Sequence, residues 1–162
     1  MAILGRVTNR AAPALRATAL AGTALLLSGC AVFSPVQTDY DYEPADGVSF
    51  TITGLDLRNL AVVVPAEGGT GTIVGQAVNR ATSAVDVTFA VDGATAPATV
   101  AVPAGSGTSL TGDGGRVEIP GIPAPPGSTV QLTVTTDEAG ANVVRVPVLP
   151  NIGYYSDLTD SP

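Results

Sequence analysis

The sequence predicts an all-β protein, a β-sandwich of about eight short strands behind an N-terminal leader. Apolar side chains alternate with polar ones in several runs, and this period of two gives a strand one buried and one solvent-facing side. Glycine and proline pairs separate the runs at a spacing typical of turns. No stretch between residues 48 and 150 has the apolar period of a long amphipathic helix.

Six strands are expected where the alternation is regular. The alternating runs are 48–52, 85–91, 100–102, 117–119, 130–134 and 144–148. The run 85–91 is the most regular, with four apolar residues separated by aspartate, threonine and alanine. Proline cannot donate a backbone hydrogen bond, so Pro147 predicts that the last strand lies at a sheet edge.

Two further strands depart from simple alternation. In 55–64 the apolar residues change from odd to even positions. Because a slip of one residue would turn the buried side outward, we expect a bulge or tight turn near Arg58 and Asn59. The segment 72–79 is apolar on both faces, as in a central strand. Together these elements indicate a sandwich of immunoglobulin-like or cupredoxin-like type.

Residues 1–29 have the three parts of a lipoprotein signal peptide. A basic segment with three arginines and no acid leads into an apolar run at 17–27. The tripeptide Leu27-Ser28-Gly29 then precedes Cys30, the sole cysteine of the chain. This is the pattern of a bacterial lipobox, in which the thiol of Cys30 receives a diacylglyceryl group and the leader is cut off before the cysteine.

Two other interpretations of the leader fit less well. An uncleaved transmembrane helix is disfavoured because the 11-residue apolar run rises only about 16 Å, roughly half of a hydrocarbon core. An ordinary secretory signal would leave the small residues before Cys30 unexplained. Since two or more acyl chains anchor a protein stably, we expect it to be held on the extracytoplasmic face of the cell membrane. The lipid consumes the only thiol, leaving none for a disulfide or for catalysis.

The remaining chain divides into a tether, one domain and a tail. Residues 30–47 hold the lipidated cysteine and an acidic, proline-containing tether, a composition that favours an extended spacer. Residues 48–150 form the β-sandwich domain, long enough for one hydrophobic core. Residues 151–162 form an acidic C-terminal tail that resembles the tether in composition.

The charge of the chain argues against two classes of partner. All seven basic residues are arginine, and histidine is absent. Removing the leader removes three arginines and no acid, so four arginines remain against 14 acids, a formal charge of −10. A nucleic-acid-binding protein needs a basic surface, and anionic lipid would repel so acidic a domain.

The same composition argues against an enzyme. Without histidine, lysine or a free thiol, the usual nucleophilic triads and dyads cannot form, and zinc sites of the usual composition are excluded. Carboxylates remain as acid–base groups, but Asp137 and Glu138 are expected at a solvated hairpin tip. The glycine-rich loop 105–115 lacks the lysine and the following helix of a phosphate-binding loop, so we interpret it as a mobile hairpin connection. We expect no catalysis and no cofactor.

Two features of the tether and tail have alternative interpretations. Asp39, Asp41 and Glu43 are a candidate calcium site because calcium takes several oxygen ligands, although a solvated acidic spacer is favoured.

All tyrosines bracket the domain, where they either anchor a partner or, as we favour, pack the termini against the sandwich. They are Tyr40, Tyr42, Tyr154 and Tyr155.

Several short motifs occur in a characteristic order. Gly-Leu-Asp-Leu-Arg-Asn-Leu at 54–60 is followed by the hairpin 75–87, by Val-Pro-Ala-Gly at 102–105 before the glycine-rich loop, and by the closing strand 144–148. This order resembles the small actinobacterial lipoproteins of the LpqE-like kind and, distantly, the PCu(A)C periplasmic copper chaperones. The likeness covers nearly the whole chain after the leader and implies an extracytoplasmic sandwich.

The copper ligands of that resemblance do not transfer to this chain. The PCu(A)C chaperones carry copper(I) on methionine, a soft thioether ligand, and on histidine, an imidazole ligand. Here histidine is absent, and the only methionine, Met1, belongs to the leader. No position of the sequence takes over the ligands.

Two functional hypotheses remain. The favoured one is a membrane-tethered, non-catalytic binding or structural module of the cell envelope, which engages an envelope protein or wall component through loops or an open strand edge. The alternative is a small-ligand or metal carrier derived from a copper-chaperone-like scaffold. The sequence identifies neither the ligand nor the oligomeric state.

Overall fold

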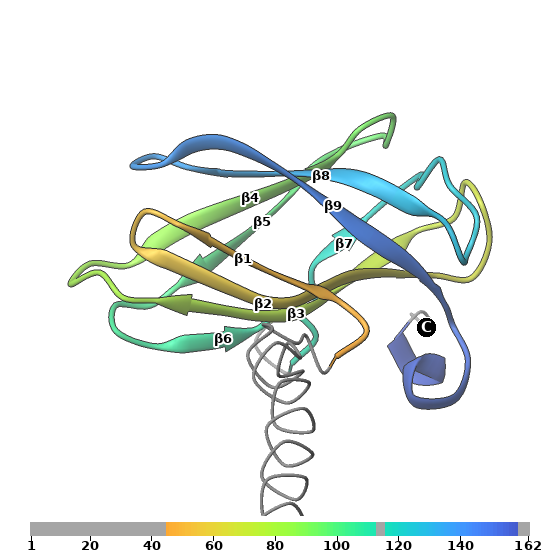
Figure 1. Ribbon diagram of the computed structural model, residues 1–162, viewed down its shortest axis with the longest axis horizontal. Helices are drawn as coiled ribbons and strands as arrows, with labels where there is room; N and C mark the ends of the chain where they lie inside the picture. Colours follow the sequence, from red (N-terminus) through yellow and green to blue (C-terminus); the bar gives the residue numbers. More distant parts are fainter. Residues whose placement is uncertain (1–44, 113–115, 159–162) are drawn as a thin grey trace, which may run out of the picture. The chain divides into compact units, whose positions relative to one another are not determined.

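The computed structural model describes residues 45–112 and 116–158, and within them nine strands form a β-sandwich (Figure 1). The elements are β1 (Val48–Ile52), β2 (Leu55–Val64), β3 (Gly71–Asn79), β4 (Val85–Val91), β5 (Ala98–Val102), β6 (Gly107–Ser109), β7 (Glu118–Ile119), β8 (Thr129–Thr136), β9 (Gly140–Pro150) and the 3-10 helix η2 (Gly153–Leu158). The predicted all-β sandwich is confirmed, with one strand more than the number expected.

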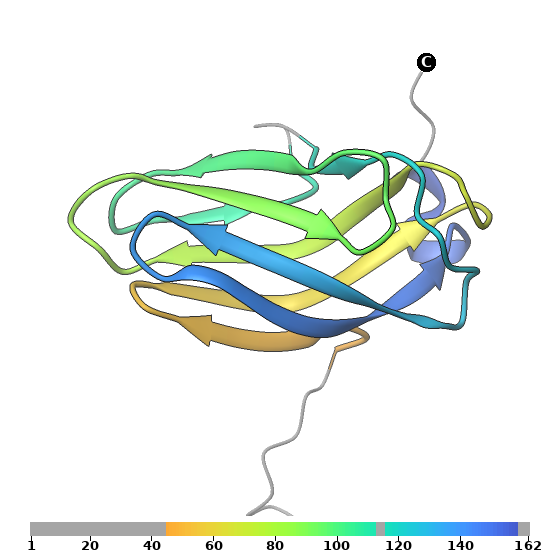
Figure 2. The same ribbon diagram turned by 90° about the horizontal axis from the view of Figure 1, so that it is seen from above.

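The strands form two layers joined by β9. One layer has the antiparallel order β5-β4-β8-β9. The other is built on the antiparallel pair β2 and β3, with β1 beside β2 and with β6 and β7 beside β3. Residues 140–147 of β9 pair with β8, and residues 148–150 run parallel to β2. Figure 2 follows β9 as it passes from the side of β8 to the side of β2.

The core lies between the two layers and follows the predicted alternation. In β4, Val87, Phe89 and Val91 are buried, whereas the two residues between them are partly exposed. They pack in one cluster with Leu57 of β2 and Leu132 of β8. Burying a side chain of this size contributes about 1.5–3 kcal/mol, so the interior between the layers is the main source of stability.

The expected bulge in β2 is confirmed. The β2–β3 register shifts between Arg58 and Ala61, and Asn59 has a positive φ of 54°, a conformation that asparagine tolerates better than most residues. The Asn59 side-chain oxygen accepts a hydrogen bond of 2.7 Å from the Gly47 backbone N–H. The bulge lets Leu55 and Leu60, on either side of it, both face the core.

The prediction that Pro147 marks an edge strand is wrong. β9 lies between β8 and β2 in the strand order. Its pairing with β8 reaches the Thr129–Pro147 pair, and its pairing with β2 begins at Val148. The proline therefore stands where the strand changes partner, and its missing N–H does not exclude a central position there.

Residues 107–109 of the glycine-rich loop form a strand that the sequence does not predict. This strand, β6, pairs antiparallel with β3 from Gln76 to Val78. A Gly-Thr-Ser strand has no apolar alternation, so its sequence does not mark it as a strand. The exposed edge of β3 supplies the backbone partners instead.

Part of the C-terminal tail packs against the domain. Residues 153–158 form η2, and Tyr155 and Leu158 pack with Leu149 on a second small cluster of Ala61, Val63 and Val74. No helix within the described residues is long and apolar enough to cross a membrane. The leader, Cys30 and the calcium candidate Asp39, Asp41 and Glu43 lie outside the described residues, as do Tyr40 and Tyr42.

Candidate functional site

The outward face of the β1–β2–β3–β6 layer has an apolar half and a polar half. On the apolar half, Ala61, Val63 and Val74 are covered by residues 151–158, the C-terminal segment. On the polar half, Arg58 pairs in register with Gln76 of β3, which pairs with Ser109 of β6. All three side chains are exposed. The bulge in β2 lies at the boundary between the two halves.

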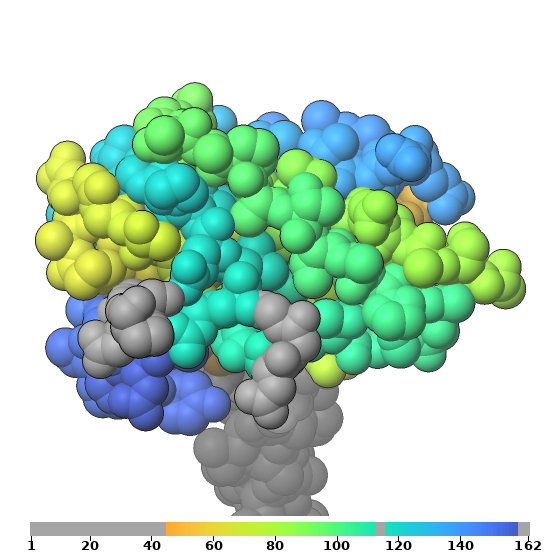
Figure 3. All heavy atoms as spheres, turned by 180° about the vertical axis from the view of Figure 1, so that it is seen from behind, coloured from red at the N-terminus to blue at the C-terminus, as the bar shows by residue number. Residues whose placement is uncertain are grey.

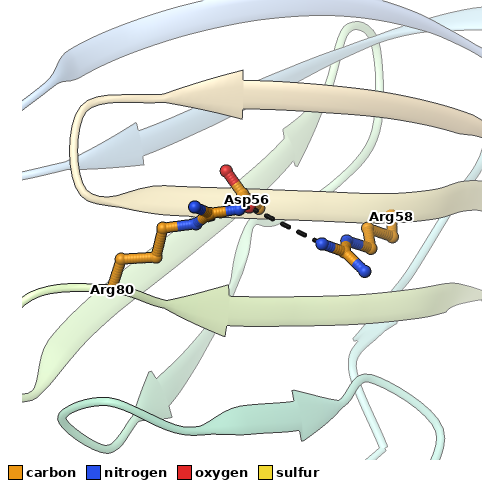
Figure 4. Close-up of polar contacts among 3 residues, drawn as sticks. All are labelled: Asp56, Arg58 and Arg80. Atoms are coloured by element: carbon orange, nitrogen blue, oxygen red, sulfur yellow. Dashed lines mark hydrogen bonds and ion pairs between the residues drawn. The ribbon is translucent and has the colours of Figure 1, made fainter.

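A buried carboxylate organises two arginines on the polar half (Figure 4). The Asp56 side chain is only 8% exposed, although it lies on the outward face. Arg80 donates from Nε to Asp56 Oδ2 over 2.7 Å, and its Nη2 contacts the same oxygen. Arg58 Nη2 lies 3.9 Å from that oxygen. The three formal charges sum to one excess positive charge.

Local backbone structure explains why these side chains meet. A two-residue turn joins β1 to β2, with Ile52 paired to Leu55 and Gly54 at a φ of 74°, a region that glycine enters without strain. Asp56 is the second residue of β2 after this turn. Arg80 comes directly after β3, and its backbone N–H donates to the Gly54 carbonyl over 2.8 Å. This bond places the start of the Arg80 side chain beside the turn and the carboxylate.

Two cavities lie on this face, and Arg58 lines both. The first, of about 520 Å³, is lined by the Asp56–Arg58–Arg80 cluster together with Ser49 and Thr51 of β1. The second has a volume of about 550 Å³ and lies between the sheet and the C-terminal segment. Its polar and aromatic walls include Gln76, Ser109, Thr111, Tyr154 and Asp157.

The C-terminal segment that walls the second cavity is held at several points. The Tyr155 hydroxyl donates to Asp46 Oδ2 over 2.9 Å, which ties the segment to the residues before β1. The Leu158 carbonyl accepts hydrogen bonds of 2.9 Å from Thr72 Oγ1 and from Arg116 Nη1. Figure 3 shows the dark-blue segment packed against the domain below the yellow residues that follow β2.

The two described tyrosines differ in environment. Burial raises the pKa of the Tyr155 hydroxyl, and its hydrogen bond to Asp46 raises it further. Tyr154 is 93% exposed, and its ring stands edge-on to that of Tyr155, with centroids 5.3 Å apart. Tyr155 therefore packs residues 153–158 against the sandwich, as favoured for the tyrosines, whereas Tyr154 presents its ring to solvent.

A third cavity, of about 270 Å³, lies at the end of the sandwich that carries the β1–β2 turn. It is lined by Asp86, Asp137 and Glu138, among others. Asp137 and Glu138 are exposed in the turn between β8 and β9, where the sequence predicts a hairpin tip. Within the described residues, no group of three or more histidine, cysteine or carboxylate side chains is arranged to hold a metal ion.

The sequence indicates Arg58 only as part of a bulge, and it does not connect Asp56 with Arg80. The sequence does contain one signal that Asp56 and Arg58 lie on the same face of their strand. Aspartate at 56 and arginine at 58 occupy the outward positions between Leu55, Leu57 and Leu60, so they belong to one face. The position of Arg80 beside them depends on the β2–β3 register, which the sequence leaves open.

No protein-family model and no curated protein matches the chain. Among solved structures, the copper-bound PCuAC domain from PmoF2 is similar with a TM-score of 0.50 and 17% identity, over 64% of this chain and 98% of that domain. The apo PmoF2 PCuAC domain has a TM-score of 0.51 and 17% identity, over 65% of this chain and 98% of that domain. The chain therefore has the cupredoxin-like fold of these PCuAC domains, at low sequence identity.

Proposed function

We propose that the protein is an extracytoplasmic lipoprotein, anchored through Cys30, whose cupredoxin-like domain is a non-catalytic binding module of the cell envelope. One observation carries this proposal. The polar half of the β1–β2–β3–β6 face presents two arginines around a buried carboxylate, beside cavities of about 520 and 550 Å³. This is an arrangement for recognising a polar partner, and the described residues offer no cluster for metal coordination.

The arginine cluster is suited to recognition because one of its two guanidinium groups, that of Arg80, is held in place before a partner arrives. Asp56 restrains the Arg80 guanidinium with charge-assisted contacts, and such restraint lowers the entropy cost of binding. The Arg58 and Arg80 side chains remain 60% and 65% exposed. Guanidinium groups with this exposure offer several N–H donors in a planar fork to carboxylate or phosphate oxygens.

The lipid anchor determines where in the cell such a module acts. A diacylglyceryl group on Cys30 holds a protein on a membrane far more firmly than one acyl chain does. The acidic tether between Cys30 and the domain allows the domain to contact a partner at a distance from the membrane. The partner is then a protein or wall component in the space next to the membrane.

A small-ligand or metal carrier is the second candidate, and the fold similarity favours it. The PmoF2 domain is described as copper-bound. Copper(I) prefers thioether, thiolate and imidazole ligands, and this chain has no histidine and a single methionine at position 1. Elemental analysis of the purified protein separates a metal carrier from a binding module, because the carrier retains a stoichiometric metal and the module does not.

Photo-crosslinking in intact cells tests the binding module. A photoreactive amino acid replaces Thr51, an exposed residue that lines the first cavity, or Gln131, an exposed residue on the outward face of the other layer. We expect a discrete crosslinked species from position 51 and none from position 131. Equal patterns from both positions, or no species from either, would contradict binding through this face.

A further inference from the structure

We propose that the two cavities around Arg58 form one groove that binds an acidic saccharide, with a carboxylate of the sugar on Arg58 and a sugar ring on Tyr154. This inference rests on the proposed binding function and specifies its ligand. Arg58 is a wall of both cavities. Between the two ends, the in-register pairs Arg58–Gln76 and Gln76–Ser109 carry polar side chains across β2, β3 and β6.

The Arg58 end has the chemistry of a carboxylate site. Among the described residues, the charged partner of Arg58 is Asp56, and their separation of 3.9 Å is longer than a hydrogen bond. Its guanidinium therefore keeps its donors for a ligand oxygen, and a carboxylate can accept two parallel N–H bonds from one guanidinium. Arg80 adds a second positive charge beside it. A chain with 14 acidic residues repels anions over most of its surface, so this cluster is a local exception.

The Tyr154 end has the chemistry of a ring site. The Tyr154 ring is 93% exposed, but the edge-on contact with Tyr155 supports it, and the hydrogen bond to Asp46 holds Tyr155 in turn. An aromatic face offers an apolar surface to the C–H groups of a pyranose ring, and the tyrosine hydroxyl can bond to water or to the sugar.

The wall between the two ends supplies partners for sugar hydroxyls. Gln76, Ser109 and Thr111 line the second cavity with one amide and two hydroxyl groups, which both donate and accept hydrogen bonds. Asp157 lines the same cavity and can only accept. The Ser109 and Thr111 hydroxyls lie 3.3 Å apart in a hydrogen bond to each other, and each keeps further capacity to donate or accept. A hydroxyl-rich chain with separated carboxylates matches this sequence of groups, whereas a purely apolar ligand would use none of them.

Titration calorimetry on the full chain, purified in the form in which cells produce it, tests the inference with three compounds. Trigalacturonic acid carries rings and carboxylates, its methyl ester keeps the rings without the charges, and triglutamate keeps the carboxylates without the sugar rings. We expect trigalacturonate to bind at least about tenfold more tightly than either control, since one charge-assisted contact is worth about a factor of ten. Equal binding of the ester or of triglutamate would overturn the saccharide assignment.

Variants place the contacts in the groove. Arg58→Gln and Tyr154→Ala each weaken trigalacturonate binding by about tenfold, whereas Arg145→Gln, on the other layer, leaves it unchanged. Equal losses in all three variants would indicate nonspecific charge effects and overturn the site. If no saccharide binds but position 51 still crosslinks a partner, this inference fails while the binding function stands. If both measurements are negative, the binding function fails as well.

Discussion

The ion pair between Asp56 and Arg80 has one buried and one exposed member, and this asymmetry predicts unequal effects of removing them. Asp56 is 8% exposed and Arg80 is 65% exposed. Arg80→Ala leaves a buried carboxylate whose nearest cation, Arg58, is 3.9 Å away. A buried charge without its hydrogen bonds is costly, so we expect a loss of about 2–3 kcal/mol in the free energy of unfolding.

Asp56→Asn removes the charge but keeps the shape and one acceptor oxygen. Arg80 is then solvated by water, so this variant should lose only about 1 kcal/mol or less. The double variant, Asp56→Asn with Arg80→Ala, has no buried carboxylate that needs a partner. Its loss in the free energy of unfolding should therefore fall well short of the sum of the two single losses. Urea unfolding followed by far-ultraviolet circular dichroism measures all three, because the chain has no tryptophan. An Asp56→Asn loss equal to or above that of Arg80→Ala would refute the reasoning.

Three other predictions concern the bulge, the C-terminal segment and the anchor. Gly75→Ala should destabilise the fold by about 1–3 kcal/mol in urea unfolding, because φ is 132° and the new Cβ would lie 2.7 Å from the Arg58 carbonyl oxygen. The raised pKa of Tyr155 means that its stabilising contribution is complete below its ordinary value near 10 and is lost as pH rises through the folded value. Ultraviolet difference titration should therefore show a tyrosinate step that Tyr155→Phe removes. Cys30→Ser should abolish incorporation of labelled palmitate, measured by metabolic labelling.

The fold could be predicted from the sequence because its main signals are local. Alternation in β4 specifies which side of the strand is buried, whatever its neighbours are. The bulge at Asn59 was predictable for a similar reason, since only an extra residue can keep Leu55 and Leu60 on the same side. The partner change of β9 at Pro147 was not predictable, because it depends on how two layers meet.

The candidate site was largely hidden in the sequence. Arg80 reaches Asp56 from 24 positions away, and only the register of β2 against β3 brings them together. The place of the C-terminal segment was hidden as well. An apolar outward half at Ala61 and Val74 requires a cover, but the sequence does not say that Tyr155 and Leu158 supply it.

The most direct test of the central claim, that this cupredoxin-like domain recognises its partner through the arginine face, is the crosslinking yield at position 51 with and without Arg58→Gln. This substitution leaves the Asp56–Arg80 contact in place and changes a side chain that is 60% exposed, so the fold should be retained. The account predicts that the crosslinked species disappears while the amount of protein in the membrane fraction stays the same. An undiminished species in the Arg58→Gln variant would contradict it.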